Sequence, residues 1–113
     1  MGYIYVIEND INDKIYVGKT TDSLSNRFSK HCWEAINRPQ KTSPLHNAIA
    51  KYGINHFFIR PLEECENSLL SEREIYWIDK LNLYLDKDKG YNGSRGGEGN
   101  LKYSSQEIIS LWN

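Results

Sequence analysis

Two short runs of β-branched and aromatic residues near the amino terminus constrain the fold of this chain more than any other feature. Residues 3–8 and 14–18 carry these runs, and the segment between them, Asn9-Asp10-Ile11-Asn12-Asp13, has the composition of a turn. This pattern predicts a β-hairpin, because strands favour branched and aromatic side chains whereas Asn and Asp favour tight turns.

The alternation of side chains along the two strands gives the hairpin two different faces. With a period of two, Ile4 and Val6 point to one face and Tyr5 points to the other. Across the hairpin, Val17 is expected to join Ile4 and Val6 against the core. Tyr5 and Tyr16 are then expected to share the opposite face, where their hydroxyls are available to a polar partner.

A first helix is expected over residues 23–37, with Cys32 beside its apolar stripe. The stripe itself is formed by Leu24, Phe28, Ala35 and Ile36. Arg27 and His31 lie together on one border of the stripe, one turn apart. They are therefore placed to reach past the edge of the core toward the hairpin.

A second helix is expected from Ser43, a favourable N-cap, through Pro44 at the first helical position, to Gly53 just past the end. Residues 56–62 are then expected to form a third strand. The Arg-Pro pair near its far end indicates an edge or a bulge there, because proline cannot donate a hydrogen bond to a neighbouring strand.

A third helix is expected from about Asn67 to Leu81. Its apolar arc is formed by Leu70, Trp77, Ile78 and Leu81. Glu74 falls inside this arc, where a carboxylate is costly unless it is paired, hydrogen-bonded or bound to a cation. Glu74 is therefore either a metal ligand, for which magnesium is suited, or the partner of an arginine in a structural ion pair.

The length and composition indicate one ordinary globular domain with a single core. The chain has 113 residues, of which 39% are hydrophobic, and it contains no apolar run long enough to cross a bilayer and no secretory signal. Cys32 and Cys65 have no metal-type spacing and are expected to be free thiols in a reducing compartment. A cytoplasmic protein of a phage or bacterial cell, without membrane association, is the resulting expectation.

The net charge argues against strong general affinity for nucleic acid. The chain has 14 Lys and Arg against 15 Asp and Glu, which gives a formal charge of −1. Nonspecific DNA binding depends mainly on the neutralisation of phosphates by a surplus of basic residues. If this chain acts on DNA, a region beyond these residues is expected to hold it there.

The carboxyl-terminal part is expected to lie outside the main domain. Residues 93–99 have the glycine content of a connector, and Ser104-Ser105-Gln106-Glu107 has the pattern of a capping box that opens a new helix. Two interpretations remain open for residues 96–113. They form either a linker and the start of a DNA-binding module, or a terminal helix that folds back on the same domain.

The order and spacing of several residues carry more information than any one of them. Tyr3-Ile4-Tyr5, followed some ten residues later by Tyr16-Val17-Gly18, resembles the paired motif that names the GIY-YIG nuclease family. The later positions that fit the family are Arg27, His31, Glu74 and Gly90-Tyr91-Asn92. The resemblance covers residues 1–95, and within the family the sequence is most similar to the phage homing endonucleases.

The resemblance implies an α+β fold, with a three-stranded antiparallel sheet flanked by helices in the order β-β-α-α-β-α. It also implies hydrolysis of double-stranded DNA with a divalent metal ion, Mg²⁺ or alternatively Mn²⁺. Glu74 would then bind the metal, and Tyr5 would activate or position the attacking water with His31 assisting. Arg27 would stabilise the negative charge that develops on the phosphate.

Two further roles follow from the resemblance, together with two departures from the family pattern. Tyr16 would orient water or phosphate, and Asn92 would brace the site. Tyr3 occupies the usual glycine position of the first motif, and Gly2 lies one residue early. His46 falls inside the second helix rather than ahead of it, so no second histidine is assigned to the site.

Three functional hypotheses follow. The first is a metal-dependent endonuclease domain of the homing type, targeted by a carboxyl-terminal DNA-binding region. The second is a catalytically inactive binding or interaction domain on the same scaffold, against which the intact Tyr5, Tyr16, Arg27 and Glu74 weigh. The third is a nuclease of the repair or restriction type. The sequence leaves the target site and the oligomeric state open.

Overall fold

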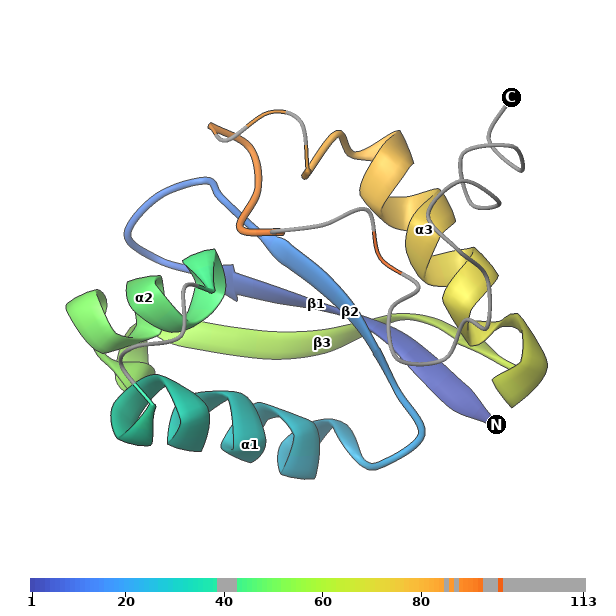
Figure 1. Ribbon diagram of the computed structural model, residues 1–113, viewed down its shortest axis with the longest axis horizontal. Helices are drawn as coiled ribbons and strands as arrows, with labels where there is room; N and C mark the ends of the chain where they lie inside the picture. The colour runs from blue at the N-terminus through green and yellow to red at the C-terminus, as the bar shows by residue number, and fades with distance from the viewer. Residues whose placement is uncertain (39–42, 85, 87, 93–95, 97–113) are drawn as a thin grey trace.

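The computed structural model is an α+β fold in which a three-stranded antiparallel sheet lies between helices on either side (Figure 1). The structure describes residues 1–38, 43–84, 86, 88–92 and 96. The strands are β1 Gly2–Asn9, β2 Tyr16–Thr20 and β3 Phe57–Cys65, and the helices are α1 Leu24–Asn37, α2 Pro44–Tyr52 and α3 Leu70–Lys80. Short 3-10 helices, η1 Ile54–His56 and η2 Asn67–Leu69, precede β3 and α3. The predicted fold class and element order are confirmed.

The hairpin forms as predicted, with β1 as the central strand of a sheet in the order β2-β1-β3. Val6 lies opposite Val17, and Tyr5 lies opposite Gly18. β2 begins at Tyr16, slightly later than expected. This register places the two aromatic motifs side by side, the first on the central strand and the second on the edge strand β2.

Both faces of the sheet are buried, and each has its own hydrophobic cluster. The cluster on the α3 side contains Ile4, Val6, Val17, Cys65, Leu70, Ile78 and Leu83. The cluster on the α1 and α2 side contains Tyr5, Ile7, Ala35, Leu45, Ala48, Ile49, Phe57 and Tyr91. The expectation of a single core is therefore wrong, because helices cover both faces and bury β1 on each side.

The third strand lies at the edge of the sheet and contains a bulge. Tyr5 is opposite Pro61 whereas the preceding Ile4 is opposite Glu63, so Leu62 is skipped in the pairing. This confirms the edge or bulge predicted from the Arg-Pro pair. The strand nevertheless continues past the proline, beyond its predicted end.

The second helix begins and ends where its capping residues predict, and the first helix spans nearly all of the predicted residues. The side chains of Ser23 and Ser43 accept backbone hydrogen bonds at the two amino-terminal ends, and Pro44 opens α2. Gly53 follows α2 with a φ of 100°, a conformation that side chains other than glycine rarely adopt. One prediction was wrong: Ile36 is 59% exposed. The buried residues of α1 are His31, Cys32 and Ala35, so the next residue, Ile36, is turned toward solvent.

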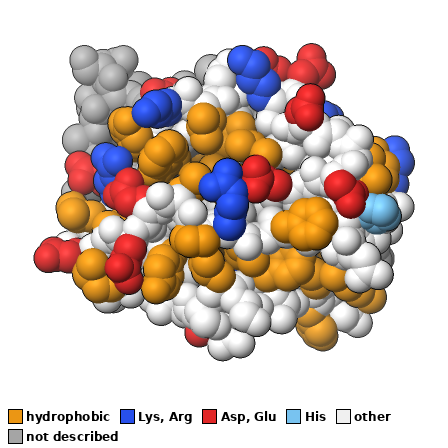
Figure 2. Space-filling view, turned by 180° about the vertical axis from the view of Figure 1, so that it is seen from behind, with side chains coloured by type: hydrophobic (Ala, Val, Ile, Leu, Met, Phe, Trp, Pro, Cys, Tyr) orange, Lys and Arg blue, Asp and Glu red, His pale blue; other side chains and the backbone are white. Residues whose placement is uncertain are grey.

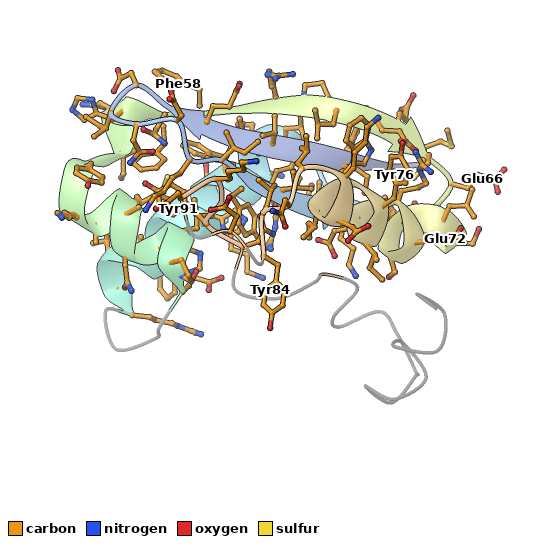
Figure 3. The ribbon with its side chains drawn as sticks, turned by 90° about the horizontal axis from the view of Figure 1, so that it is seen from above. Phe58, Glu66, Glu72, Tyr76, Tyr84 and Tyr91 are labelled. Atoms are coloured by element: carbon orange, nitrogen blue, oxygen red, sulfur yellow. The ribbon has the colours of Figure 1, made fainter. Side chains whose placement is uncertain are left out.

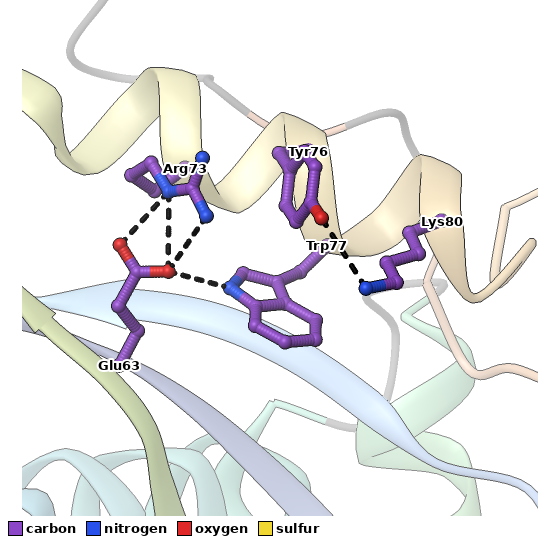
Figure 4. A network of polar contacts seen from close by, with 5 residues as sticks. All are labelled: Glu63, Arg73, Tyr76, Trp77 and Lys80. Carbon is purple, nitrogen blue, oxygen red and sulfur yellow. Dashed lines mark hydrogen bonds and ion pairs between the residues drawn. The ribbon is translucent and has the colours of Figure 1, made fainter.

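The rotation of α3 is fixed by contacts of its outer side with β3 (Figure 4). Arg73 Nε donates to the Oε2 oxygen of Glu63 at 2.8 Å. Trp77, one turn further along, donates through Nε1 to the Oε1 oxygen of Glu63 at 3.0 Å. Because Arg73 and Trp77 both face β3, their neighbour Glu74 is turned toward the interior, where it is buried.

Residues 90–92 run alongside β2. Gly90 forms a parallel bridge with Ile15, and the Tyr91 backbone nitrogen donates to the Ile15 oxygen at 2.8 Å. Asn12, in the hairpin turn, donates to the Tyr91 hydroxyl at 2.9 Å, and Tyr91 lies against the hairpin (Figure 3). The chain after α3 is thereby attached to the strand that carries the second motif.

Three further expectations concern the thiols, the membrane and the carboxyl-terminal part. Cys32 and Cys65 are buried free thiols, as predicted. Within the described part of the chain, no helix is long and apolar enough to cross a membrane. The predicted linker and helix over residues 96–113 lie outside the described residues, apart from Gly96.

Candidate active site

The hydroxyl of Tyr5 is the centre of a buried hydrogen-bond network. Arg27 Nε donates to the hydroxyl oxygen at 3.1 Å, and this oxygen lies 2.7 Å from Nε2 of His31. Arg27 and His31 reach the same oxygen because residues four apart share one face of α1. The placement of both residues toward the hairpin was predicted, although His31 is more deeply buried than expected, with 3% exposed.

His31 is a neutral member of this network. Burial, reinforced by the positive charge of Arg27, lowers the pKa of His31 to about 3. Since the Tyr5 oxygen accepts from Arg27, its own proton is directed to Nε2 of His31. We therefore assign the ring proton of His31 to Nδ1, which lies 2.9 Å from Nε2 of His46.

His46 is thus a member of the network that sequence analysis missed. Its position in the second helix was predicted correctly, but its distance from the site depends on how α1 and α2 pack together. No local pattern encodes that packing. We call the group formed by Tyr5, Tyr16, Arg27, His31 and His46 the tyrosine network.

Gly18 of the second motif leaves the space that the Tyr5 side chain of the first motif occupies. A Cβ atom at Gly18 would lie 2.5 Å from Cζ of Tyr5 and closer still to its hydroxyl, so only glycine leaves space for the phenol. The Tyr16 ring packs beside it, with ring centroids 6.3 Å from Tyr5 and 5.4 Å from His31. Gly18 is therefore a positioning residue whose importance is steric.

Both tyrosines are un-ionised near neutral pH. Burial raises the pKa of Tyr5 to about 12, although Arg27 partly opposes the shift, and burial also raises the pKa of Tyr16. The negative charge of Glu74 contributes to the raised pKa of each tyrosine. Glu74 is thus close enough to influence both hydroxyls, and a cation beside it would favour their ionised forms.

Glu74 approaches the site from the α3 side of the sheet. It is buried, with 7% exposed, and its Oε1 oxygen lies 3.7 Å from Nζ of Lys19. The same ammonium donates to Oγ of Ser71 at 3.0 Å. Sequence analysis allowed an ion pair with an arginine, whereas the observed partner is a lysine that it did not single out.

The described residues fit a metal ion that needs few protein ligands. No group of three or more His, Cys, Asp or Glu side chains that could hold an ion is present in the described part of the chain. Structural zinc sites need such a group. Magnesium instead takes one or two carboxylates and completes its shell with water and substrate oxygens, so Glu74 alone suffices as its protein anchor.

Asn92 supports β2 from its outer side. Its side-chain nitrogen donates to the Val17 oxygen at 2.8 Å, and its side-chain oxygen accepts from the Val17 nitrogen at 3.0 Å. The amide therefore pairs with the edge strand as a neighbouring strand residue would. This contact holds the backbone between Tyr16 and Gly18.

The six predicted site residues thus occupy three separate parts of the structure: a group around Tyr5, helix α3, and the segment beside β2. Tyr5, Tyr16, Arg27 and His31 lie in one hydrogen-bonded or packed group. Glu74 is near this group and coupled to it through charge, and Asn92 braces the strand between them.

Comparison with known protein sequences identifies the family to which this chain is similar. The family described as the GIY-YIG catalytic domain matches residues 1–92. Protein 146R of Invertebrate iridescent virus 6, named for an MSV199 domain, is 45% identical over 79 residues, which are 70% of this chain and 31% of that protein. Intron-associated endonuclease 1 of Enterobacteria phage T4 is 36% identical over 91 residues, which are 79% of this chain and 35% of the endonuclease.

The fold is also similar to a solved structure. A mutant catalytic domain of intron endonuclease I-TevI superposes with a TM-score of 0.70 at 33% identity, covering 85% of this chain and 97% of that domain. The chain spans roughly a third of the length of the curated relatives just named. With the family matched over most of the chain and the fold shared, this protein belongs to the GIY-YIG family, and residues 1–92 are its nuclease catalytic domain.

Proposed function

We propose that this chain is the DNA-cleaving domain of a homing-type endonuclease and hydrolyses double-stranded DNA with Mg²⁺, or alternatively Mn²⁺. One observation carries the proposal: Arg27 and His31 converge on the Tyr5 hydroxyl, and the negative charge of the buried Glu74 contributes to the raised pKa of both Tyr5 and Tyr16. An activating phenol, a guanidinium and a carboxylate for a metal are the groups that phosphodiester hydrolysis needs.

Three side chains would act directly on the metal, the water and the phosphate. Glu74 would hold the divalent ion, whose positive charge stabilises the phosphate oxygens and favours ionisation of water. Tyr5 would position the attacking water. A cation beside Glu74 would favour loss of the Tyr5 proton to solvent, and the resulting phenolate would then accept the proton of that water. Arg27 would contact the phosphate as its negative charge increases.

The other members of the site hold these groups in place. His31 would orient the Tyr5 hydroxyl as a neutral hydrogen-bond acceptor, and His46 would fix the tautomer of His31. Tyr16 would orient water or phosphate beside Tyr5. Asn92 would brace β2 through its two hydrogen bonds with Val17.

Targeting is assigned to a region after the catalytic domain. On the face drawn in Figure 2, acidic and basic side chains are interspersed among exposed apolar ones, which agrees with the formal charge of −1 and with weak general affinity for DNA. We assign residues 1–95 to the nuclease domain, and residues 96–113 to a linker and the start of a carboxyl-terminal helix that begins a DNA-binding module. We propose that it acts inside a cell, in the cytoplasm of a phage-infected or bacterial host, which the similarity to a phage endonuclease supports.

The decisive experiment measures nicking of supercoiled plasmid by the purified chain, with Mg²⁺ compared with EDTA. The variants are wild type, Glu74→Gln and, as a matched control, Glu72→Gln. Glu72 lies on the same helix but is exposed and points away from the sheet (Figure 3). A parallel fusion to an unrelated DNA-binding domain compensates for weak affinity.

Cleavage that requires the metal, survives Glu72→Gln and falls by at least about 10³-fold in Glu74→Gln would support the proposal. The assay is run with Mg²⁺ and with Mn²⁺, and folding of each variant is checked by circular dichroism. If the folded chain and its fusion cut nothing with either metal, the endonuclease proposal is wrong and the scaffold serves binding instead.

A further inference from the structure

Lys19 is a buried charge that none of the catalytic assignments uses. It follows Gly18 on β2, and alternation along the strand turns it to the α3 face, which it shares with Val17. Its side chain is 11% exposed, which is rare for a lysine and requires a polar or charged environment. Helix α3 supplies part of that environment.

Two groups on α3 hold the Lys19 ammonium. Nζ donates to Oγ of Ser71 at 3.0 Å and lies 3.7 Å from Oε1 of Glu74. Ser71 and Glu74 are three residues apart and therefore occupy the same face of the helix. Lys19 thus joins the edge strand to α3 at the carboxylate to which we assign the metal.

We propose that Lys19 is a positioning residue that neutralises Glu74 when no metal is bound and thereby lowers the affinity of Glu74 for a divalent cation. The proposal rests on the assignment of Glu74 as the metal ligand. A buried carboxylate without a positive partner strongly destabilises a folded protein, so the ion pair lets the metal-free domain keep its structure.

The same ammonium opposes metal binding, because any cation held by the Glu74 oxygen lies near a positive charge. Even with the screening of bulk water, a unit charge and a double charge a few ångströms apart repel enough to change binding about tenfold. Lys19 therefore lowers the metal affinity both by occupying the carboxylate and by repelling the incoming ion.

The test is direct measurement of Mn²⁺ binding by electron paramagnetic resonance, together with thermal unfolding in EDTA and in Mn²⁺. Wild type is compared with Lys19→Met and Lys19→Gln, which remove the charge, and with Lys19→Arg, which retains it. We expect both neutral variants to bind Mn²⁺ about tenfold more tightly than wild type, and Lys19→Arg to stay within about threefold. In the neutral variants we also expect a lower Tm in EDTA and a larger rise in Tm with Mn²⁺.

Two outcomes overturn the proposal at different levels. Equal or weaker Mn²⁺ affinity in the folded neutral variants makes Lys19 a purely structural link and leaves the metal assignment intact. If wild type and Glu74→Gln respond identically to Mn²⁺, then Glu74 is not the metal ligand and both proposals are wrong.

A measurement on wild type keeps the test independent of variant folding. The ¹⁵Nζ resonance of Lys19 is followed during titration with Mg²⁺. We expect it to shift as the ion replaces the ammonium at Glu74. A resonance that stays unchanged while the ion binds overturns the proposal.

Discussion

The two faces of the sheet are both covered by helices, yet they bring different chemistry to the β2 edge. On the α1 and α2 face, Tyr5 and His31 are neutral groups, and short hydrogen bonds link them to each other and to His46. On the α3 face, an otherwise aliphatic cluster contains the charged pair of Glu74 and Lys19.

This difference shows how one small fold separates groups that would otherwise neutralise each other. Neutral polar groups can be buried when each is hydrogen-bonded, whereas a buried carboxylate needs an opposite charge. With the sheet between the faces, Arg27 is hydrogen-bonded to Tyr5 while Glu74 pairs with Lys19. The two halves of the site thus approach β2 from opposite faces of the sheet.

The largest predicted effect comes from Gly18→Ala, which places a methyl group against the Tyr5 phenol. The added Cβ would displace the Tyr5 phenol, while the backbone at Gly18 has no left-handed φ that would itself exclude alanine. We expect plasmid cleavage to fall by about 10³-fold, equivalent to about 4 kcal/mol, and urea unfolding to show a loss of about 1–3 kcal/mol. Part of that stability should return in the double variant with Tyr5→Phe, because the closest atom is removed. Wild-type cleavage by Gly18→Ala would contradict the assigned position of Tyr5.

Tyr5→Phe tests the α1 and α2 face alone, because it keeps the ring and removes the oxygen shared by Arg27 and His31. Cleavage should fall by about 10²-fold, or about 2.7 kcal/mol, with a folded protein by circular dichroism. Tyr3→Phe, on the same strand and outside the network, should cleave within about twofold of wild type. Equal losses in the two variants would remove the special role of Tyr5.

Asn92→Leu tests the brace outside β2. The change leaves the buried Val17 nitrogen and oxygen without the two hydrogen bonds of the Asn92 amide, which should lower the free energy of unfolding by about 2 kcal/mol. Urea denaturation measures the effect. Asn47→Leu, at an exposed position of α2, should change stability by less than about 0.5 kcal/mol. An equally small change in Asn92→Leu would show that β2 needs no brace.

Acid should weaken the neutral network through His31. Its folded pKa is about 3, below the unfolded value of about 6.5, so between these values the unfolded chain binds more protons. The stability is therefore complete above about pH 6.5 and decreases as the pH falls toward 3, by about 1.4 kcal/mol per pH unit. Urea unfolding at several pH values measures this slope, which His31→Gln should reduce. An unchanged slope in that variant would assign the acid sensitivity to other groups.

The smallest effect is expected outside the site, at an ion pair that contrasts with the buried pair of Lys19 and Glu74. Arg60 contacts Glu8 with Nε–Oε1 2.6 Å, but both side chains are largely exposed. Arg60→Ala should change the free energy of unfolding by no more than about 0.5 kcal/mol, because water and salt screen exposed pairs. A loss above about 2 kcal/mol in urea would show that exposure is a poor guide to the energy of ion pairs in this fold.

Most of the fold was predictable from the sequence, because its signals are local. The hairpin alternation, Ser43 with Pro44, and Gly53 each encode an element or its boundary within a few residues. The same holds for Glu74, since a carboxylate on an apolar helical arc is anomalous whatever surrounds it.

What could not be predicted depends on contacts between elements. Lys19 is an ordinary strand lysine until α3 packs over it, and His46 is an ordinary helical residue until α2 packs against α1. Ile36 was placed in the core because hydrophobicity gives the buried arc of a helix only approximately. Burial of both sheet faces was missed although residues 3–7 form an uninterrupted apolar and aromatic run, which is the pattern of a strand buried on both faces.

The pairing of Asn92 and Gly90 with β2 also affects the tendency of the domain to aggregate. An open edge strand exposes backbone groups that can pair with the edge of another molecule and start aggregation. Segment 90–92 occupies part of the β2 edge, while β3 at the opposite edge carries a proline, a bulge and a charged residue at position 60. The two edges are thus protected from intermolecular pairing by different features. Shortening the chain before residue 90 would expose the backbone groups of β2, the edge strand that carries Tyr16 and Gly18.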